Sequence, residues 1–452
     1  MIIRDIEKQV LGTVTPTMNY RMKIKKIVNE INEILVKEIK KRNLPVTVEL
    51  VGSIAKDTYL KDNMDIDFFL CFPTDFLKED IARYALEIGK SFLKNTEESY
   101  AEHPYLRGYY KDFFIEVVPC YQIEKANQKL SAVDRTPLHT RFVIQNITND
   151  KKKEVRLFKQ FLKGINCYGA EAQIEGFSGY LCEILIIRYG CFEKLLKDAV
   201  KWSYGKKIAI IKGVYPDFYT PLVFIDPVDK ERNVASAVSE EKFKFFIKAS
   251  KEYLKNPKIT FFFPDGIKAW SLSKIRSEIA KQKCRYIGVR IEKPDIIDEN
   301  LYPQIRKSLR SIVDECKRYD FTIFDSTYYV DNLYIIFILK AKIGHLPLTL
   351  EHKGPPVAKK ENSEEFLKKW ENNPRVVKPS FQKNKRWYVE IKREYLDIKD
   401  FLTDQIKNLS MGKHIDKVVR EKYTIIEDEN LVIENLKTFW TEYLDEKMPW
   451  ER

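Results

Sequence analysis

The chain has 452 residues, which is too long for a single hydrophobic core, because cores stop growing at about 250 to 300 residues. Its composition is 44% hydrophobic and 13% aromatic, which excludes a largely disordered chain. The 79 Lys and Arg residues against 66 Asp and Glu residues give a net charge of +13. An excess of this size favours a polyanionic partner, although a basic and merely soluble protein fits the charge equally well.

The cysteines and the apolar segments exclude several other classes of protein. Seven cysteines are scattered without a paired CxxC spacing, so neither a zinc site nor a disulfide framework is indicated. The amino-terminal MIIRDIEKQV lacks the basic-then-apolar pattern of a signal peptide, and no apolar stretch approaches the roughly 18 residues of a membrane span. We therefore expect a soluble, cytoplasmic protein of roughly two to four domains that has no membrane partner.

The first part of the chain alternates between helical and strand periodicity, which predicts a sheet with flanking helices. Thr15 and Pro16 have the pattern of a helix cap followed by a first-turn proline. We expect, in order, a helix of about 25 residues after Pro16, a strand over 46–53, a short helix or turn over 55–62, a strand over 65–72, a helix over 77–93 and a hairpin over 105–123 that turns near Lys111-Asp112.

Between residues 150 and 255 the pattern becomes helical. In the segment 154–165, Arg156, Lys159 and Lys163 recur on a basic face that is separate from the apolar stripe. Further helices are expected over 179–200 and 235–254.

Strands return after residue 258, in an order that resembles half of a ferredoxin-like or RNA-recognition arrangement. The segment 355–395 mixes basic residues with aromatic ones, which suits an RNA surface, although a solvated helix followed by an ordinary strand fits equally well. We expect strands over 258–264, 286–291, 322–331 and 333–341, and a helix over 302–319.

Asp65 and Asp67 interrupt a strand that is otherwise built to be buried. Residues i and i+2 of a strand project from the same face, about 6.5 Å apart, so both carboxylates can converge on ions separated by about 3.5 to 4 Å. Glu116 also breaks an apolar run, on a later strand, and is the candidate third carboxylate. An isolated DxD is most often a solvated edge strand or a calcium ligand, but the residues that flank this one are apolar. Because the sequence offers no obvious cation nearby, we favour a site for two metal ions.

Gly52 and Ser53 end the preceding strand and open a short helical turn. Backbone N–H groups and a hydroxyl in this arrangement can hold phosphate oxygens, although a Gly-Ser pair alone is usually only a turn. The DxD about a dozen residues downstream strengthens the phosphate interpretation.

This order of motifs resembles the nucleotidyltransferase superfamily typified by DNA polymerase beta, and five blocks narrow the resemblance to the archaeal, class I CCA-adding enzymes. The blocks occur in order and span about half of the chain, chiefly its first 240 residues, whereas the carboxy-terminal half matches only in general layout. They are GSIAKDTYLKDNMDIDFFLCFP, IEVVPCY, SAVDRTPLHTRF, CYGAEAQIEGFSGYLCEILI and DPVDKERNVASAVS.

The resemblance implies a template-independent polymerase that adds or repairs the 3′-terminal CCA of tRNA, using CTP, ATP and two Mg²⁺ ions. Asp65, Asp67 and Glu116 take the catalytic, metal-binding positions. Arg232 would read the incoming base together with the tRNA end, Thr136 would help to hold the nucleotide, and Ser53, His139, Lys159 and Tyr168 would contact the triphosphate. The nucleotide-binding positions are Gly52, Ser53, Lys56, Thr136, His139, Lys159, Tyr168 and Arg232.

Two positions depart from the family pattern: Glu116 stands where Asp is more usual, and Lys56 where Arg is common. Lysine keeps the charge but loses the planar fork that grips phosphate at two points. Outside their blocks the other residues have ordinary explanations: a loop cap for His139, a core position for Tyr168 and a solvated helix face for Lys159.

The expected fold class is α+β, with a polymerase-beta-like nucleotidyltransferase head (1–142), a helical neck (143–220), a body (221–285 and 376–452) and a tRNA-binding tail (286–375). Two other functions stay open: a poly(A) polymerase-like nucleotidyltransferase, and a catalytically silent protein that binds tRNA or nucleotide. The family suggests a monomer or a homodimer.

Overall fold

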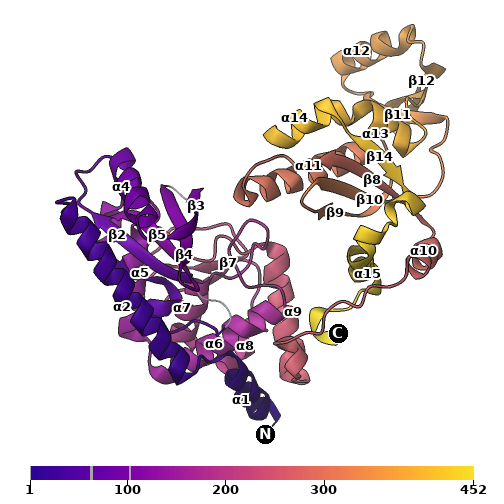
Figure 1. Ribbon diagram of the computed structural model, residues 1–452. Coiled ribbons are helices and arrows are strands. Elements are labelled where there is room, and N and C mark those ends of the chain that lie inside the picture. Colours follow the sequence, from indigo (N-terminus) through magenta and orange to yellow (C-terminus); the bar gives the residue numbers. More distant parts are fainter. Residues whose placement is uncertain (1, 62–64, 101–102) are drawn as a thin grey trace. The chain divides into compact units, whose positions relative to one another are not determined.

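The computed structural model describes residues 2–61, 65–100 and 103–452, which form two compact units. Unit 1 comprises residues 1–266 and 448–452, and unit 2 comprises residues 267–447 (Figure 1). Both units contain helices and strands, which confirms the α+β class. No helix in the described ranges is long and apolar enough to cross a membrane.

A five-stranded sheet of order β1-β2-β5-β4-β3 forms the first half of unit 1 (Figure 1). The strand predicted over 65–72 and the hairpin that turns at 111–112 are confirmed, whereas the sequence did not predict β3. β2 pairs in parallel with β5 and antiparallel with β1. The strands are β1 (Thr47–Leu50), β2 (Asp65–Phe72), β3 (Lys94–Tyr100), β4 (Pro104–Tyr110) and β5 (Phe113–Tyr121).

The side chains of β2 alternate between two different environments. Ile66, Phe68, Leu70 and Phe72 are buried against the helices α2 (Met18–Lys41) and α4 (Lys78–Lys90). Because strand side chains alternate, the odd-numbered residues of β2 face away from these helices, toward the cluster that contains Phe69 and Cys71. Asp65 and Asp67 therefore lie on the face of the sheet that α2 and α4 do not cover.

The amino-terminal helices differ from the prediction at one boundary. Thr17, not Thr15, caps α2, because its hydroxyl accepts a hydrogen bond from the Tyr20 backbone N–H. An additional helix, α1 (Ile2–Val14), precedes it and packs on the helical half of unit 1.

The second half of unit 1 packs helices around an aromatic core that includes Phe158, Phe161, Phe177, Phe192 and Phe246. The helix predicted over 179–200 is divided at Gly190, whose positive φ of 87° ends α7. The elements are α5 (Arg135–Asn146), α6 (Asn149–Gly164), α7 (Gly179–Tyr189), α8 (Phe192–Ala199), α9 (Glu240–Lys255), and the parallel pair β6 (Lys206–Ile208) and β7 (Leu222–Phe224).

One prediction for this half is wrong. The expected strand over 258–264 is a 3-10 turn at Ile259–Phe261, because Phe261 and Phe262 turn inward to pack in the core. The ordinary alternative for Lys159, a solvated helix face, does not hold, since the side chains of Arg156 and Lys159 are each only 2% exposed and form ion pairs.

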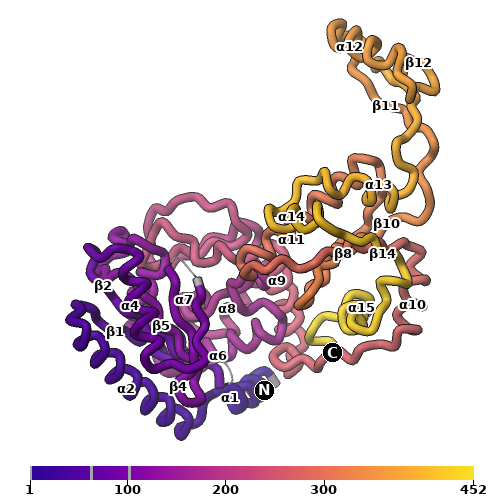
Figure 2. Tube along the Cα trace, turned by 45° about the horizontal axis from the view of Figure 1, so that its top comes forward, coloured from indigo at the N-terminus to yellow at the C-terminus, as the bar shows by residue number. Residues whose placement is uncertain are grey.

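Unit 2 contains two antiparallel sheets, of order β14-β8-β10-β9 and β11-β13-β12. In Figure 2 the second sheet and α12 form a separate lobe at one end of the unit. The expected division between body and tail at residue 375 falls within this second sheet. The elements are α10 (Leu272–Lys281), β8 (Cys284–Glu292), α11 (Asp298–Arg318), β9 (Ile323–Val330), β10 (Tyr334–Lys342), β11 (Thr349–Pro356), α12 (Lys360–Glu371), β12 (Val376–Lys383), β13 (Arg386–Lys392), α13 (Ile398–Gln405), α14 (Lys413–Glu421), β14 (Thr424–Glu427) and α15 (Lys437–Asp445).

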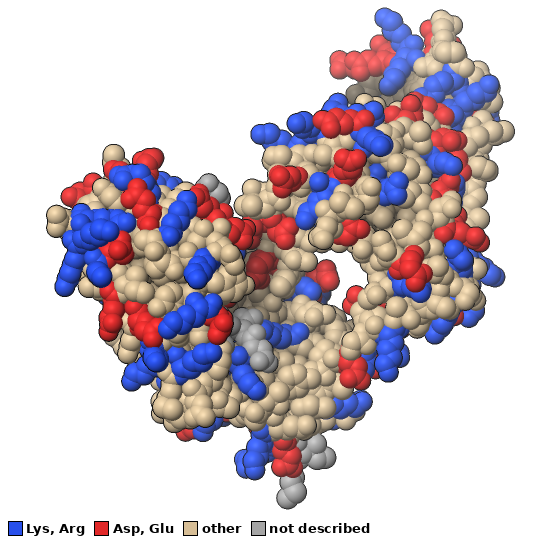
Figure 3. Space-filling view, viewed as in Figure 1, with Lys and Arg blue, Asp and Glu red and all other residues tan. Residues whose placement is uncertain are grey.

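The charged surface gives little guidance to a partner. On the face shown in Figure 3, Lys and Arg side chains are interspersed with Asp and Glu and are not gathered into one patch. The net charge of +13 therefore does not mark a binding surface on that face.

Candidate active site

Three acidic residues lie on adjacent strands of the unit 1 sheet. The parallel register pairs Asp67 of β2 with Glu116 of β5, so both side chains leave the same face, and Asp65 lies two residues earlier on that face. Burial, together with the nearby negative charges of Glu116 and Asp65, raises the pKa of Asp67 to about 8. The three carboxylates therefore lie close together in a partly buried site, where burial and mutual repulsion disfavour the ionised forms of Asp67 and Glu116.

Arg107 is a neighbour of this group that the sequence argument missed. Its Nε lies 2.8 Å from Glu116 Oε1, and the antiparallel register of β4 and β5 pairs the two residues directly. Burial raises the pKa of Glu116, and the Arg107 guanidinium opposes that shift. The premise that no cation faces the carboxylates is therefore wrong for Glu116. The predicted turn at 111–112 already implied this pairing, because it places residue 107 opposite residue 116.

The donor set fits a hard divalent cation in kind. Carboxylate oxygens are the ligands that Mg²⁺ prefers, and a bound cation would relieve the repulsion between Asp67 and Glu116. Within the described ranges, however, no three acidic, His or Cys side chains are gathered closely enough to hold a metal as they stand. Binding would therefore require a local movement, and the ion pair between Glu116 and Arg107 is the contact that such a movement would change.

Gly52 allows the chain to pass directly above Asp67. Gly52 begins the five-residue helix α3 (Gly52–Lys56) with a φ of 70°, a backbone conformation that residues other than glycine rarely adopt. A Cβ at this position would lie 1.9 Å from Asp67 Oδ2. Ser53 follows and is half-buried, and the close approach to the DxD is made by Gly52.

Lys56 and Lys159 share a buried carboxylate partner, Glu183 of α7. Lys56 Nζ lies 2.6 Å from Glu183 Oε2, and Lys159 Nζ lies 3.2 Å from Glu183 Oε1. Burial alone would raise the pKa of Glu183, but the two ammonium groups lower it below its ordinary value. The Thr58 hydroxyl donates a third hydrogen bond. Sequence reasoning missed Glu183, although a single acid in the apolar segment GYLCEILIIRY was a signal of a buried ion pair.

Tyr168 lies beside this group. A Cβ built on Gly179 would be 3.1 Å from the Tyr168 hydroxyl and 3.7 Å from Lys159 Nζ, so the two polar groups approach the same point. Burial raises the pKa of the Tyr168 phenol, which therefore stays protonated. Lys163 Nζ lies 5.6 Å from the centroid of the Tyr168 ring.

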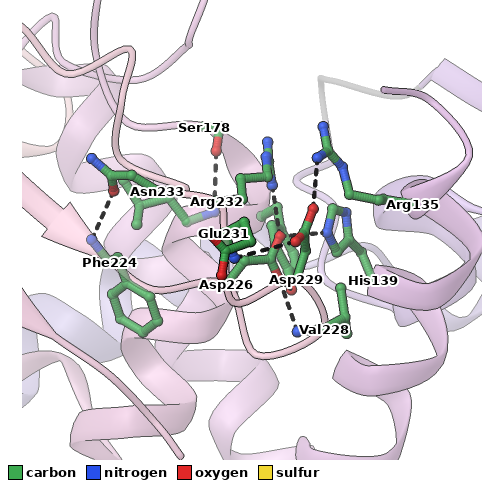
Figure 4. A network of polar contacts seen from close by, with 12 residues as sticks. Arg135, His139, Ser178, Phe224, Asp226, Val228, Asp229, Glu231, Arg232 and Asn233 are labelled. Carbon is green, nitrogen blue, oxygen red and sulfur yellow. Dashed lines mark hydrogen bonds and ion pairs between the residues drawn. The ribbon is translucent and has the colours of Figure 1, made fainter. Parts of the chain in front are cut away.

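His139 and Arg232 meet at the carboxylate of Asp226 (Figure 4). Tyr180 stacks on the His139 ring, with centroids 4.1 Å apart and planes at 25°. Thr136 lies one turn before His139 on α5 and is half-buried. Asp226 and Tyr180 were not predicted as site residues, although both lie in blocks that carried the resemblance.

Lys56 connects the predicted residues into one region of unit 1. Its ammonium group is close enough to lower the pKa of both Asp67 and His139, although burial dominates the pKa of each. Asp67 and His139 therefore both lie near Lys56, whose Nζ is also 5.9 Å from the centroid of the Tyr180 ring that stacks on His139.

Family models match three successive parts of the chain. A nucleotidyltransferase domain matches residues 31–139, the second domain of tRNA nucleotidyltransferases matches residues 153–263, and the C-terminal domain of CCA-adding enzymes matches residues 284–428.

Individual relatives agree with these matches. The CCA-adding enzyme of Methanosarcina barkeri is 35% identical over 434 residues, which cover 95% of each chain. That of Methanocaldococcus jannaschii is 35% identical over 436 residues, covering 92% of this chain and 94% of the relative. Among solved structures, the Cid1 poly(U) polymerase with Mg and 3′-dATP bound has a TM-score of 0.44 at 13% identity, covering 57% of this chain and 95% of its own. The chain belongs to the CCA-adding enzyme family, a family of tRNA nucleotidyltransferases.

Proposed function

We propose that this protein adds and repairs the 3′-terminal CCA of tRNA from CTP and ATP. The RNA 3′-hydroxyl would attack the α-phosphate of the nucleotide, and pyrophosphate would leave. The observation that supports this most strongly is the parallel register that sets Glu116 beside Asp67, with Asp65 on the same face and Gly52 in contact. The match to CCA-adding enzymes over nearly the whole chain supports the choice of substrate.

Asp65, Asp67 and Glu116 would hold two Mg²⁺ ions, and nucleotidyltransferases typically use a divalent metal. Bound divalent ions would lower the pKa of the attacking hydroxyl and neutralise charge on the leaving pyrophosphate. The side chain of Glu116 reaches farther than the more usual Asp and would have to leave or share Arg107 to contribute.

The remaining residues would bind and orient the nucleotide. Lys56 and Lys159 together carry two positive charges against the single charge of Glu183, so this buried group keeps a net positive charge beside the triphosphate. Ser53 and Tyr168 would contribute hydroxyl donors to the phosphate oxygens.

His139 and Thr136 on α5 and Arg232 on the facing loop would hold the rest of the nucleotide, with Arg232 directed at the base. Arg232 keeps 32% of its side chain exposed, which leaves it accessible to a ligand.

Unit 2 would bind the body of the tRNA. Its three-stranded sheet carries Phe381 stacked on Tyr388, with centroids 6.0 Å apart and planes at 24°. Lys378 Nζ lies 4.6 Å from the Phe381 ring centroid and Lys383 Nζ lies 5.8 Å from that of Tyr388. Aromatic rings with cations above them suit RNA bases and phosphates. Location in the cytoplasm and assembly as a monomer or homodimer stay predictions.

A primer-extension assay tests the proposed function. The substrate is a tRNA that ends before CCA, with CTP and ATP supplied singly and together. We expect CTP alone to add two C residues, ATP alone to add nothing, and the two together to complete CCA. Tailing of any RNA by ATP alone would instead identify a poly(A) polymerase-like enzyme. Binding of tRNA without any addition would identify a catalytically silent protein.

A further inference from the structure

The loop between β7 and α9 is fixed by its own backbone before any ligand is considered. Ile225 and Asn233 form an antiparallel bridge, and the Asp226 N–H donates to the Arg232 carbonyl at 3.0 Å. The Asn233 side chain closes the base of the loop by accepting hydrogen bonds from two backbone N–H groups, one of them 2.8 Å away at Phe224 (Figure 4). The side chains of Asp226 and Arg232 therefore leave this loop from directly paired positions.

The Asp226 carboxylate is fully buried and receives four donors. His139 Nε2 lies 2.8 Å and Arg232 Nη1 2.9 Å from Oδ2, while the Tyr180 hydroxyl lies 3.2 Å and the Val228 N–H 3.1 Å from Oδ1. Burial alone would raise the pKa of Asp226, but the hydrogen bonds from His139, Val228 and Arg232 hold it at about 2. A carboxylate has about four acceptor sites, so these donors leave no site for a nucleotide.

The same contacts fix the state of His139. Burial lowers its pKa, although the hydrogen bond to Asp226 acts in the opposite direction, so the ring is neutral at neutral pH. A neutral ring next to an ionised carboxylate donates from Nε2, which leaves the lone pair on Nδ1. Tyr180 stacks on the ring and donates to Asp226 as well, so it also fixes the rotation of the imidazole.

We propose that Asp226 is a positioning residue that holds His139 and Arg232 at one fixed separation, so that contact with the triphosphate and recognition of the base depend on each other. The inference rests on the proposed function, which places His139 and Arg232 on the nucleotide. Asp226 acts through these two side chains and does not touch the ligand. One end of the Arg232 guanidinium is held by Asp226, while the side chain remains 32% exposed and can meet a base.

Asp229 provides a matched control within the same loop. Its Oδ2 accepts from Lys129 Nζ at 3.0 Å and from Arg135 Nη1 at 2.9 Å, and its side chain is 7% exposed. It thus resembles Asp226 in burial and in the number of cationic or imidazole partners. Figure 4 shows Asp229 beside Arg135. Neither Lys129 nor Arg135 belongs to the proposed nucleotide site. Asp229→Asn therefore reproduces the loss of charge without disturbing His139 or the Arg232 side chain.

Asp226→Asn places a donor conflict on His139 and Arg232, whereas the same type of conflict in Asp229→Asn falls on Lys129, Arg135 and the Glu231 N–H. An amide offers one acceptor oxygen and one donor nitrogen where the carboxylate offered two acceptors. If the amide nitrogen faces Arg232 and His139, two donors meet at Arg232 and the imidazole must change tautomer. If the amide nitrogen instead faces Tyr180 and Val228, it lies against the Val228 N–H, and again two donors meet.

The experiment measures steady-state kinetics of the full chain on a tRNA that ends before CCA. The KM and kcat are determined for CTP, and discrimination is measured as the kcat/KM ratio of CTP to UTP. We expect Asp226→Asn to raise the KM about 10-fold and to lower the discrimination about 10-fold, with a smaller change in kcat. Asp229→Asn should stay within about 2-fold of wild type. Equal effects of the two variants would overturn the proposal.

A double-mutant comparison separates positioning from general damage. If Asp226 acts through Arg232, then Asp226→Asn should add little to the discrimination defect of Arg232→Ala, whereas a fully additive defect contradicts the proposal. Tyr180→Phe removes a single hydrogen bond to Asp226 and provides a second test of the proposal if Asp226→Asn fails to fold. We expect it to raise the KM about 2- to 5-fold, and an unchanged KM counts against the proposal. If wild-type protein adds neither CMP nor AMP, the proposed function itself fails, which is a distinct result.

Discussion

Two kinds of buried acid occur within unit 1, and they differ in what surrounds them. Glu183 and Asp226 each receive several donors from cationic or polar groups, and each has a lowered pKa in spite of burial. Asp67 and Glu116 instead face each other across a parallel strand pair, and each has a raised pKa. The first kind of acid is satisfied by the protein. Asp67, and Glu116 in spite of its ion pair with Arg107, become fully favourable only when a cation arrives from outside.

This difference predicts opposite responses to the same type of substitution. Removing a satisfied acid leaves its buried cationic partners without compensation and destabilises the fold. Removing an acid from the repelling pair relieves the fold but removes chemistry, as expected for a functional site.

The largest expected effect is on activity, when the repelling pair is broken. Asp67→Ala should lower the rate of CCA addition by about 1,000-fold or more, because it removes a metal ligand without touching the nucleotide. Binding of tRNA should be retained, as measured by filter binding or gel shift. A variant that extends tRNA as well as wild type would show that the metal site is elsewhere or absent.

Breaking the satisfied group around Glu183 should act on stability. Glu183→Ala leaves Lys56 and Lys159 buried without their shared partner, and we expect a loss of about 3 to 5 kcal/mol in the free energy of unfolding. Urea denaturation measures it. The control is Glu87→Ala on the exposed face of α4, where the ion pair with Arg83 should contribute less than about 1 kcal/mol. Similar losses in both variants would contradict the distinction.

The sequence predicted the repelling pair better than the satisfied acids, for a physical reason. The bounds of β2 and the face of Asp65 and Asp67 follow from strand alternation, which is a local property. The partners of Arg156 and Lys159 are set by tertiary contacts instead: Asp57 is 99 residues from Arg156, and Glu183 is 24 residues from Lys159. The basic face of α6 was therefore interpreted as separate from the apolar stripe, although Arg156 and Lys159 on it are buried.

Errors in the fold have a similar origin. The run FFF at residues 261–263 is apolar enough for a strand, but periodicity alone does not distinguish a strand from a buried turn. Arg107 is different, because the predicted hairpin already set its register against Glu116. That contact was within reach of the sequence and was missed.

The contact of Gly52 with Asp67 provides a smaller effect on the same site. Gly52→Ala would place a methyl group where the Asp67 carboxylate now lies, and we expect a 10- to 100-fold loss of CCA addition with all metal ligands present. Gly205→Ala is the control, because Gly205 also has a positive φ, of 82°, but nothing lies within 4 Å of its Cβ position. Both variants should lose about 1 to 2 kcal/mol of stability from backbone strain. Equal activity in the two would show that Gly52 does not shape the site.

The smallest effect is on thermal stability, and its sign separates the two kinds of acid most directly. The pKa of Asp67 is raised from 3.8 to about 8 by folding, so its charge begins to oppose folding as the pH rises above 4 and does so fully above 8. In EDTA, Asp67→Asn should therefore raise the Tm at pH 8.5 by roughly 2 to 5 °C and by less at pH 5.5. Added Mg²⁺ should raise the Tm of wild type but not that of the variant.

Asp226→Asn should behave oppositely. Folding lowers the pKa of Asp226 to about 2, so the ionised carboxylate stabilises the fold at both pH values. Its loss should therefore lower the Tm at both pH values, with or without Mg²⁺. A change in Tm of the same sign in both variants would contradict the distinction between an acid that the protein satisfies and one that needs a bound cation.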